Sequence, residues 1–158
     1  MTASHHHDHA SCRSEALEAA RRLTERRGLK LTETRARVLD IVAESHTPIG
    51  AYDILQRLAG ERGRAAPPTV YRALGFLVEQ GFVHRIDTLN AFVACFDAER
   101  SHDAGFLICE TCKTVDEIAE PALGEAVRKT VAARGFKPRR TVVEISGTCA
   151  ACAAQAKA

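Results

Sequence analysis

The sequence lacks any apolar run close to the roughly 18 residues that a membrane-spanning helix needs, so we expect no membrane partner. Its first nine residues lack the basic-then-apolar order of a secretory signal. Internal repeats, low-complexity segments and heptad runs are also absent. These absences predict a cytoplasmic protein in a reducing compartment, where paired cysteines are more often metal ligands than disulfides.

The chain also lacks a strong excess of charge of either sign, with a formal net charge of +2 over 158 residues. Residues 1–85 hold 13 Lys and Arg against 10 Asp and Glu, or +3, and residues 86–158 hold 9 against 10, or −1. A mildly basic first half is compatible with a DNA-facing module. The length fits one ordinary domain or two small ones.

Two C-x-x-C pairs are the most informative feature that is present. They are Cys109-Glu-Thr-Cys112 and Cys149-Ala-Ala-Cys152. Four thiolates delivered as two close pairs suit a tetrahedral Zn²⁺ ion, and such sites are usually structural. We therefore expect Cys109, Cys112, Cys149 and Cys152 to hold a structural zinc ion.

Four helices are expected in the first half of the chain. Apolar spacing and end signals place them at about 14–27, from a cap at Thr32 onward, at 51–59, and from a cap at Thr69 to Gly81. Two short strands, 82–86 and 91–96, follow the last helix. Helices followed by a β-hairpin form a winged helix-turn-helix.

The second half predicts an α+β module. Residues 106–109 and 114–118 resemble strands joined by the first C-x-x-C pair, 121–135 a helix, and 140–145 a further strand. We expect a winged-helix domain at 1–86, with a disordered His-rich tail at 1–13, a hinge at 87–91, and a metal-binding domain at 92–158.

The segment Pro68-Thr-Val-Tyr-Arg-Ala-Leu74, followed by the two C-x-x-C pairs, resembles the ferric-uptake-regulator family, and within it the zinc-uptake branch. The resemblance covers about residues 15–152. It implies a homodimeric, metal-activated transcriptional repressor with an N-terminal winged-helix domain and a C-terminal α/β dimerisation domain. Its partner would be a double-stranded DNA operator, and its targets zinc uptake genes.

The resemblance also implies a regulatory zinc site, which gives two Zn²⁺ ions per protomer. The matching ligands are His84, Cys95, His102 and Glu117. The histidines of a further site, typical of the iron and peroxide branches, are missing, because residues 103–106 and 139–141 contain none. A sensor of iron, manganese, nickel or peroxide is thus the weaker alternative.

DNA contacts are expected along the fourth helix. Arg72 points away from its apolar stripe, and the family uses this Tyr-Arg pair, so Arg72 and Tyr71 are the candidates for base contact. Thr69, Arg35 and Arg37 are the candidates for phosphate contact.

Two other functions compete with this hypothesis. An enzyme such as a zinc deaminase needs His-x-Glu with Pro-Cys-x-x-Cys, and the sequence has neither, so we expect no enzyme and no small-molecule substrate. A thiol-redox protein could use the C-x-x-C pairs as disulfides. The tail residues His5, His6, His7, His9 and Cys12 could bind zinc weakly, but they are expected to have no role.

Overall fold

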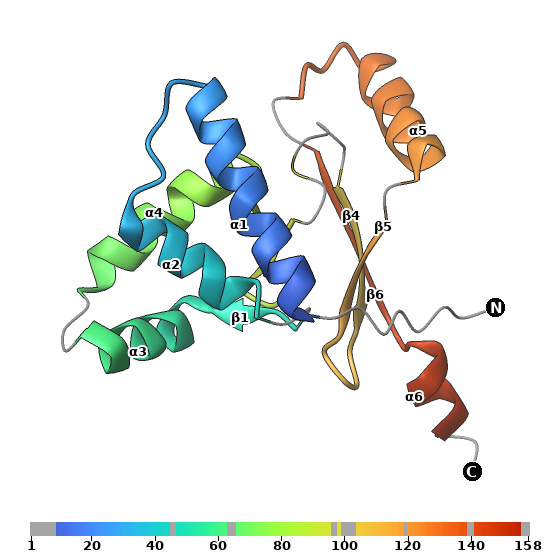
Figure 1. Ribbon diagram of the computed structural model, residues 1–158. Helices are drawn as coiled ribbons and strands as arrows, with labels where there is room; N and C mark the ends of the chain where they lie inside the picture. Colours follow the sequence, from blue (N-terminus) through green and yellow to red (C-terminus); the bar gives the residue numbers. More distant parts are fainter. Residues whose placement is uncertain are drawn as a thin grey trace. The chain divides into compact units, whose positions relative to one another are not determined.

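Figure 1 shows the computed structural model of the chain, which describes residues 9–44, 47–62, 66–95, 98, 104–118, 120–138 and 141–155. The side chains of residues 9–12, 61, 62 and 104 lie outside this description. The chain divides into two compact units, a first unit of residues 1–100 and a second unit of residues 101–158. No helix among the described residues is long and apolar enough to cross a membrane.

Helices and a small sheet make up the described part of the first unit. The helices are α1 (His9–Arg26), α2 (Glu33–Val42), α3 (Ala51–Arg62) and α4 (Pro67–Glu79). The strands are β1 (Ile49–Gly50), β2 (Val83–Ile86) and β3 (Ala91–Ala94), antiparallel in the order β1-β3-β2. Helices followed by a hairpin confirm the predicted winged helix-turn-helix.

The starts of α2 and α4 show one confirmed cap and one correction. Thr32 caps α2, because its side chain accepts a hydrogen bond from Arg35 N at 3.4 Å. Thr69 does not cap α4. The N-cap is Ala66, and Pro67 is the first helical residue, where its missing N–H leaves no bond unmade. Thr69 therefore lies within the first turn, with an exposed side chain.

Two helices are longer than the sequence predicts. Helix α1 begins at His9 instead of Ser14, so the expected disordered tail is helical from His9 onward. Helix α3 continues through Gly60 to Arg62. A glycine inside a helix costs about 1 kcal/mol relative to alanine, so Gly60 weakens this helix without ending it.

The core of the first unit forms where the apolar faces of the helices meet the hairpin. Helix α4 contributes its predicted stripe, and the opposite face, with Tyr71 and Arg72, is exposed. Phe76 is half-buried and packs against this core. The buried members of the stripe are Val70, Ala73, Leu74 and Leu77.

The boundary between the units differs from the predicted hinge at 87–91. Residues 87–90 form the hairpin turn, in which Asn90 has φ of 48° and its N–H donates to Asp87 O at 3.2 Å. Strand β3 is hydrogen-bonded to both β2 and β1. These ladders hold β3 in the first unit, and the division falls after Arg100.

The second unit contains the strands β4 (Ala104–Cys109), β5 (Val115–Ile118) and β6 (Val142–Gly147) and the helices α5 (Pro121–Ala132) and α6 (Ala150–Gln155). The strand order is β5-β4-β6, with β4 antiparallel to β5 and parallel to β6. Helix α5 lies in the crossover that a parallel pair requires. The α+β prediction is confirmed. Helix α6 lies beyond the elements that the sequence predicts.

Helix α5 approaches β4 closely at Gly105. A Cβ atom on Gly105 would lie 2.7 Å from Ile118 Cγ1 and 3.0 Å from Leu123 Cδ2, so a side chain there would displace both. The apolar stripe of α5 consists of Leu123, Val127 and Val131, at helical spacing, and all three are only half-buried. Much of the apolar face of α5 thus remains accessible within one chain.

Asp40 in α2 joins two helices through charged hydrogen bonds. Its carboxylate accepts from Arg13 of α1 and from Arg37 one turn earlier in α2. The hydrogen bond from Arg13 is the largest cause that lowers the pKa of Asp40, and the guanidinium of Arg37 lowers it further. The same pair raises the pKa of Arg13. The carboxylate therefore contributes more to the folded state when it is ionised.

We expect Asp40→Asn to lower the free energy of unfolding by about 1–2 kcal/mol at pH 7. Because the folded-state pKa lies below the unfolded value of about 4, this contribution is complete above pH 4 and is lost as the pH falls through the folded pKa. Urea unfolding at pH 7 and pH 3, followed by tyrosine fluorescence, measures it. Both tyrosines, Tyr52 and Tyr71, lie in the first unit and the chain has no tryptophan.

Asp53→Asn, at an exposed carboxylate in the first turn of α3, is the matched control and should have a smaller effect at pH 7. An Asp40→Asn protein as stable as wild type at pH 7, or one with an equal deficit at both pH values, would contradict the assignment.

Candidate metal centres and nucleic-acid interface

Four cysteine side chains of the second unit meet at one point. Cys109 ends β4 and Cys112 lies in the turn that follows it, while Cys149 directly precedes α6 and Cys152 lies in its first turn. Their sulfur atoms all lie within 4.8 Å of one another, and the Sγ atoms of Cys112 and Cys149 are 3.8 Å apart. A tetrahedral ion with Zn–S distances of about 2.3 Å places its sulfur ligands about 3.8 Å apart. The cluster, which consists of the predicted residues Cys109, Cys112, Cys149 and Cys152, fits a zinc ion.

Backbone N–H groups point at the sulfur atoms of this cluster. Cys109 Sγ accepts from Cys112 N at 3.5 Å and from Cys149 N at 3.4 Å, and Cys149 Sγ accepts from Cys152 N at 3.5 Å. The first turn is tightened by Lys113, whose φ of 61° lies in the left-handed region. These donors offset part of the negative charge of four thiolates. None of the described cysteines is in a disulfide.

The pKa values of the cysteines in this cluster differ. The backbone N–H groups of Cys112 and then Cys149 lower the pKa of Cys109 to about 5. Hydrogen bonds with Cys149 and then Cys112 raise the pKa of Cys152 to about 12. The hydroxyl of Thr114 lowers the pKa of Cys112. A zinc ion binds thiolates, so zinc loading releases the protons that remain.

A second pair of donors lies on the hairpin of the first unit. His84 in β2 is paired with Val93 in β3, so Cys95, two residues farther along, lies diagonally opposite on the same face. The donor atoms of His84 and Cys95 lie within 4.8 Å of each other. Cys95 is buried and His84 is half-buried. We call His84 and Cys95 the wing pair.

The Nε2 atom of His84 is shielded from solvent and makes no hydrogen bond within the described part of the chain, although the residue has other interactions. The other two predicted ligands belong to the second unit. Glu117 is half-buried in β5, where it is paired with Phe106 of β4. His102 lies outside the described residues. The four-ligand site remains a prediction.

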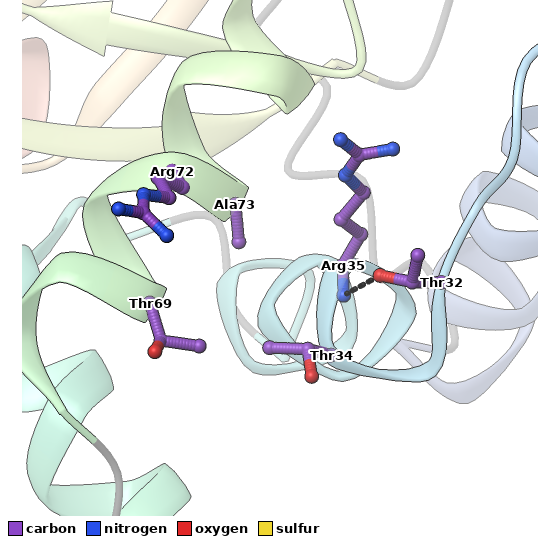
Figure 2. A pocket seen from close by; sticks show the side chains of 6 residues that line it. All are labelled: Thr32, Thr34, Arg35, Thr69, Arg72 and Ala73. Carbon is purple, nitrogen blue, oxygen red and sulfur yellow. Dashed lines mark hydrogen bonds between the residues drawn. The ribbon is translucent and has the colours of Figure 1, made fainter.

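A hollow on the first unit separates the start of α2 from the start of α4 (Figure 2). Thr69 and Arg72 lie on the α4 side, and Thr34 and Arg35 lie on the α2 side. Its six lining residues include two guanidinium groups and three hydroxyl groups but no acid. Hydroxyls and guanidiniums beside the N-terminal end of α2 together suit an anion such as a DNA phosphate.

The predicted phosphate contacts Arg35 and Arg37 both have partners within the protein. The Arg35 guanidinium lies 3.6 Å from the centroid of the Phe76 ring, and its Nη1 donates to Lys30 O at 2.7 Å. It is therefore held in place where it lines the hollow. Arg37 is paired with Asp40. Their i,i+3 spacing on α2 is a local signal that could have found this pairing, whereas the contact of Asp40 with Arg13 joins distant parts of the chain.

Sequence patterns do not identify two further residues of the first unit. Thr34 lines the hollow from the first turn of α2, and a hydroxyl at a helix N-terminus is the signal that could have found it. Tyr52 is 70 % exposed and Tyr71 is 62 % exposed. Tyr52 could have been predicted to be exposed, because it lies off the buried face of α3, which carries Ile54 and Leu58.

Comparison with known proteins places these features in a family context. Residues 26–146 match the model of the ferric uptake regulator family. The chain is 39 % identical over 140 residues to the zinc uptake regulation protein of Escherichia coli (strain K12), covering 87 % of this chain and 81 % of that protein.

Two solved structures are also similar. "Zinc Uptake Regulator Complexed With Zinc AND DNA" gives a TM-score of 0.85 at 36 % identity, covering 92 % of this chain and 98 % of that one. "Crystal structure of holo XcZur" gives a TM-score of 0.79 at 40 % identity, covering 87 % and 96 %.

Proposed function

Because the chain belongs to the ferric uptake regulator family, we propose that it is a zinc-responsive, DNA-binding transcriptional repressor of zinc uptake genes. It acts in the cytoplasm as a regulator of transcription and not as an enzyme. The relatives named as zinc uptake regulators, one of them in complex with zinc and DNA, support this choice within the family.

The observation that carries the proposal is the placement of the wing pair. The unit that exposes α4, with Tyr71 and Arg72, also holds an imidazole and a thiol with donor atoms within 4.8 Å of each other. A metal ion that binds His84 and Cys95 is thus held by the same compact unit that contacts DNA. Metal supply and DNA binding can therefore be linked.

The regulatory site is completed in this proposal by His102 and Glu117. Two neutral imidazoles, one thiolate and one carboxylate form a neutral complex with Zn²⁺, and mixed ligands suit an exchangeable site. Zinc then favours the arrangement of the units that supplies all four ligands. A shift from 1:99 to 99:1 needs about 5.5 kcal/mol of differential binding, which one zinc ion can supply.

The four-cysteine cluster has a structural role, so each protomer binds two zinc ions. Both C-x-x-C pairs lie at the same end of β4 and β6, where Cys109 pairs with Gly147. An ion there fastens the last strand to the first hairpin of the second unit. It is expected to be retained when the regulatory site empties.

The second unit is also proposed to form the homodimer. The half-buried stripe on α5 is accompanied by exposed apolar residues, of which Phe136 is 67 % exposed. Leu107 and Ile145 are direct partners in the parallel ladder and are both exposed. A second copy would bury this surface. A dimer then presents two α4 helices to half-sites about 34–36 Å apart on duplex DNA.

In the DNA complex, Arg72 and Tyr71 contact bases, and Thr69, Arg35 and Arg37 contact phosphates. Exposure on α4 supports the first pair. The acid-free hollow supports Thr69 and Arg35. Arg37 has the weakest support, since its guanidinium already donates a hydrogen bond to Asp40.

Arg72→Ala should reduce discrimination between specific and random DNA by about 1–3 kcal/mol, because Arg72 supplies a bidentate contact to guanine. The specific probe is a duplex selected from a random library by the zinc-loaded wild-type protein, and the reference is its scrambled sequence. Arg26→Ala, which removes the same charge from exposed α1, is the control. An equal loss of affinity for both duplexes would show that Arg72 does not read bases.

Anaerobic titration of the wild-type protein with Zn²⁺, Fe²⁺ or Mn²⁺, scored by its affinity for the selected duplex, tests the proposal as a whole. We expect tightening at the lowest free concentration of Zn²⁺. A stronger response to Fe²⁺ or Mn²⁺ would favour the alternative family sensor. DNA binding that responds to oxidants but to no metal would favour the thiol-redox alternative.

A further inference from the structure

The turn between α4 and β2 joins the DNA-facing helix to the wing pair. Gly81, with φ of 78°, follows the end of α4, and its N–H donates to Val78 O at 3.1 Å. Phe82 N donates to Leu77 O at 2.9 Å. These two bonds form a Schellman motif, which fixes the direction of the chain as it leaves the helix. His84 follows two residues later, so little chain separates α4 from the first ligand.

Arg27, directly after α1, fastens this turn from the side. Its Nη1 donates to the carbonyl oxygen of Gln80 at 2.9 Å and to Oε1 of the same residue at 3.1 Å. The guanidinium carbon also lies 5.8 Å from the centroid of the Phe82 ring. Phe82 is only 1 % exposed, so the ring that the Arg27 guanidinium contacts is fixed in the core. The carbonyl of Gln80 lies at the C-terminal end of α4, where a cation is favoured.

Phe82 is hydrogen-bonded to the other half of the wing pair. Its carbonyl oxygen accepts from Cys95 N at 3.0 Å. The residue that the Arg27 guanidinium contacts is therefore bonded to one proposed ligand and lies two residues before the other. A short run of contacts leads from α1 through Arg27 and Phe82 to both ligands.

We propose that Arg27 is a positioning residue that couples zinc binding at the wing pair to the placement of α4. The inference rests on the proposed function. A zinc ion restrains the hairpin directly, and the restraint reaches α4 through the shared core and through the turn that joins helix and hairpin. Arg27 supplies stiffness that the covalent turn alone does not, because it fastens the joint to a third element, α1. Without it, zinc still binds, but the restraint reaches α4 incompletely.

The test compares Arg27→Met with wild type in zinc binding and in affinity for the selected duplex, with and without Zn²⁺. We expect the zinc-induced gain in DNA affinity to fall at least about fivefold. Affinity for DNA without zinc, and for zinc without DNA, should change less than about twofold.

Arg27→Lys retains the charge at the end of α4 and should restore part of the gain. Arg26→Met, the neighbouring charge removal, should behave as wild type. Tyrosine fluorescence melting checks that each variant is folded.

Three outcomes would overturn the inference. A zinc-induced gain in Arg27→Met equal to that of wild type shows that Arg27 is not needed for coupling. A second outcome is that Arg27→Met loses DNA affinity equally with and without zinc, on selected and random duplexes alike. If the slope of log affinity against log salt also falls by about one, Arg27 is a phosphate contact instead. A wild-type protein without any zinc-induced gain overturns the proposed function itself, and this inference with it.

Discussion

The Cys109→Ser protein will lose zinc from the four-cysteine cluster and, with it, the folded structure of the second unit. Structural zinc binding contributes about 10–16 kcal/mol in small peptides, against a total stability of about 5–15 kcal/mol for a typical domain. Within one chain, the described part of the second unit buries few apolar residues. The apolar residues described as buried in it are Phe106, Ile108, Cys109 and Val115. A core of that size needs an additional cross-link, such as a bound metal ion, to remain folded.

Two signals separate the units in this experiment. Tyrosine fluorescence reports only the first unit, because both tyrosines are there and the chain has no tryptophan. Its urea transition should survive in Cys109→Ser. Hydrogen exchange should become fast in β4, β5 and β6. Elemental analysis should show at most one zinc ion. Cys95→Ser is the matched control, and it should keep one zinc ion and a protected second unit. Full zinc content with normal melting in Cys109→Ser would contradict a structural role.

Cys95→Ser and His84→Ala should each abolish most of the response of DNA binding to zinc. Both variants remove one donor of the wing pair, and the remaining ligands bind zinc more weakly. We expect a zinc-induced gain in affinity of at least about tenfold in wild type and less than about twofold in either variant. Affinity without zinc should be unchanged, because neither residue belongs to the α4 face proposed to contact DNA.

Competition with a chromogenic chelator measures the second zinc ion in the same samples. Cys12→Ser and His46→Ala remove a thiol and an imidazole that belong to neither proposed site, and both should respond as wild type. If Cys95→Ser and His84→Ala still bound two zinc ions and still tightened on DNA with zinc, the regulatory site would lie elsewhere.

The fold was largely accessible from the sequence because its elements carry local signals. The stripe of α4, the cap of α2 and the glycines after α1, α4 and α5 depend on residues close together in the chain. The division between the units was misplaced because it depends on a distant partner. The sequence predicts the hairpin from strands 82–86 and 91–96, but β3 also pairs with β1, which is just two residues long, and this ladder holds β3 in the first unit. Helix α3 was predicted too short because a glycine lowers helix stability without ending the helix.

The same distinction between local signals and distant contacts applies to the residues of the sites. The spacing of the C-x-x-C pairs is local, and the structure brings all four sulfur atoms together. The pairing of Arg13 with Asp40 and the stacking of Arg35 on Phe76 join residues from different helices, so a list of exposed basic residues could not reveal them. The role of Arg27 depends on contacts with residues more than 50 positions away.

The parallel alignment of β4 with β6 has a consequence for how the chain reaches its native state. Strands that run in the same direction cannot form from a tight turn, so the ends of a long intervening segment must first meet, which makes folding slow. The thiolates at the far ends of both strands can capture a metal ion while the ladder is still open. We expect such early ligation to favour the Cys109–Gly147 register, so that the second unit regains its sheet faster when it refolds with Zn²⁺ than without it.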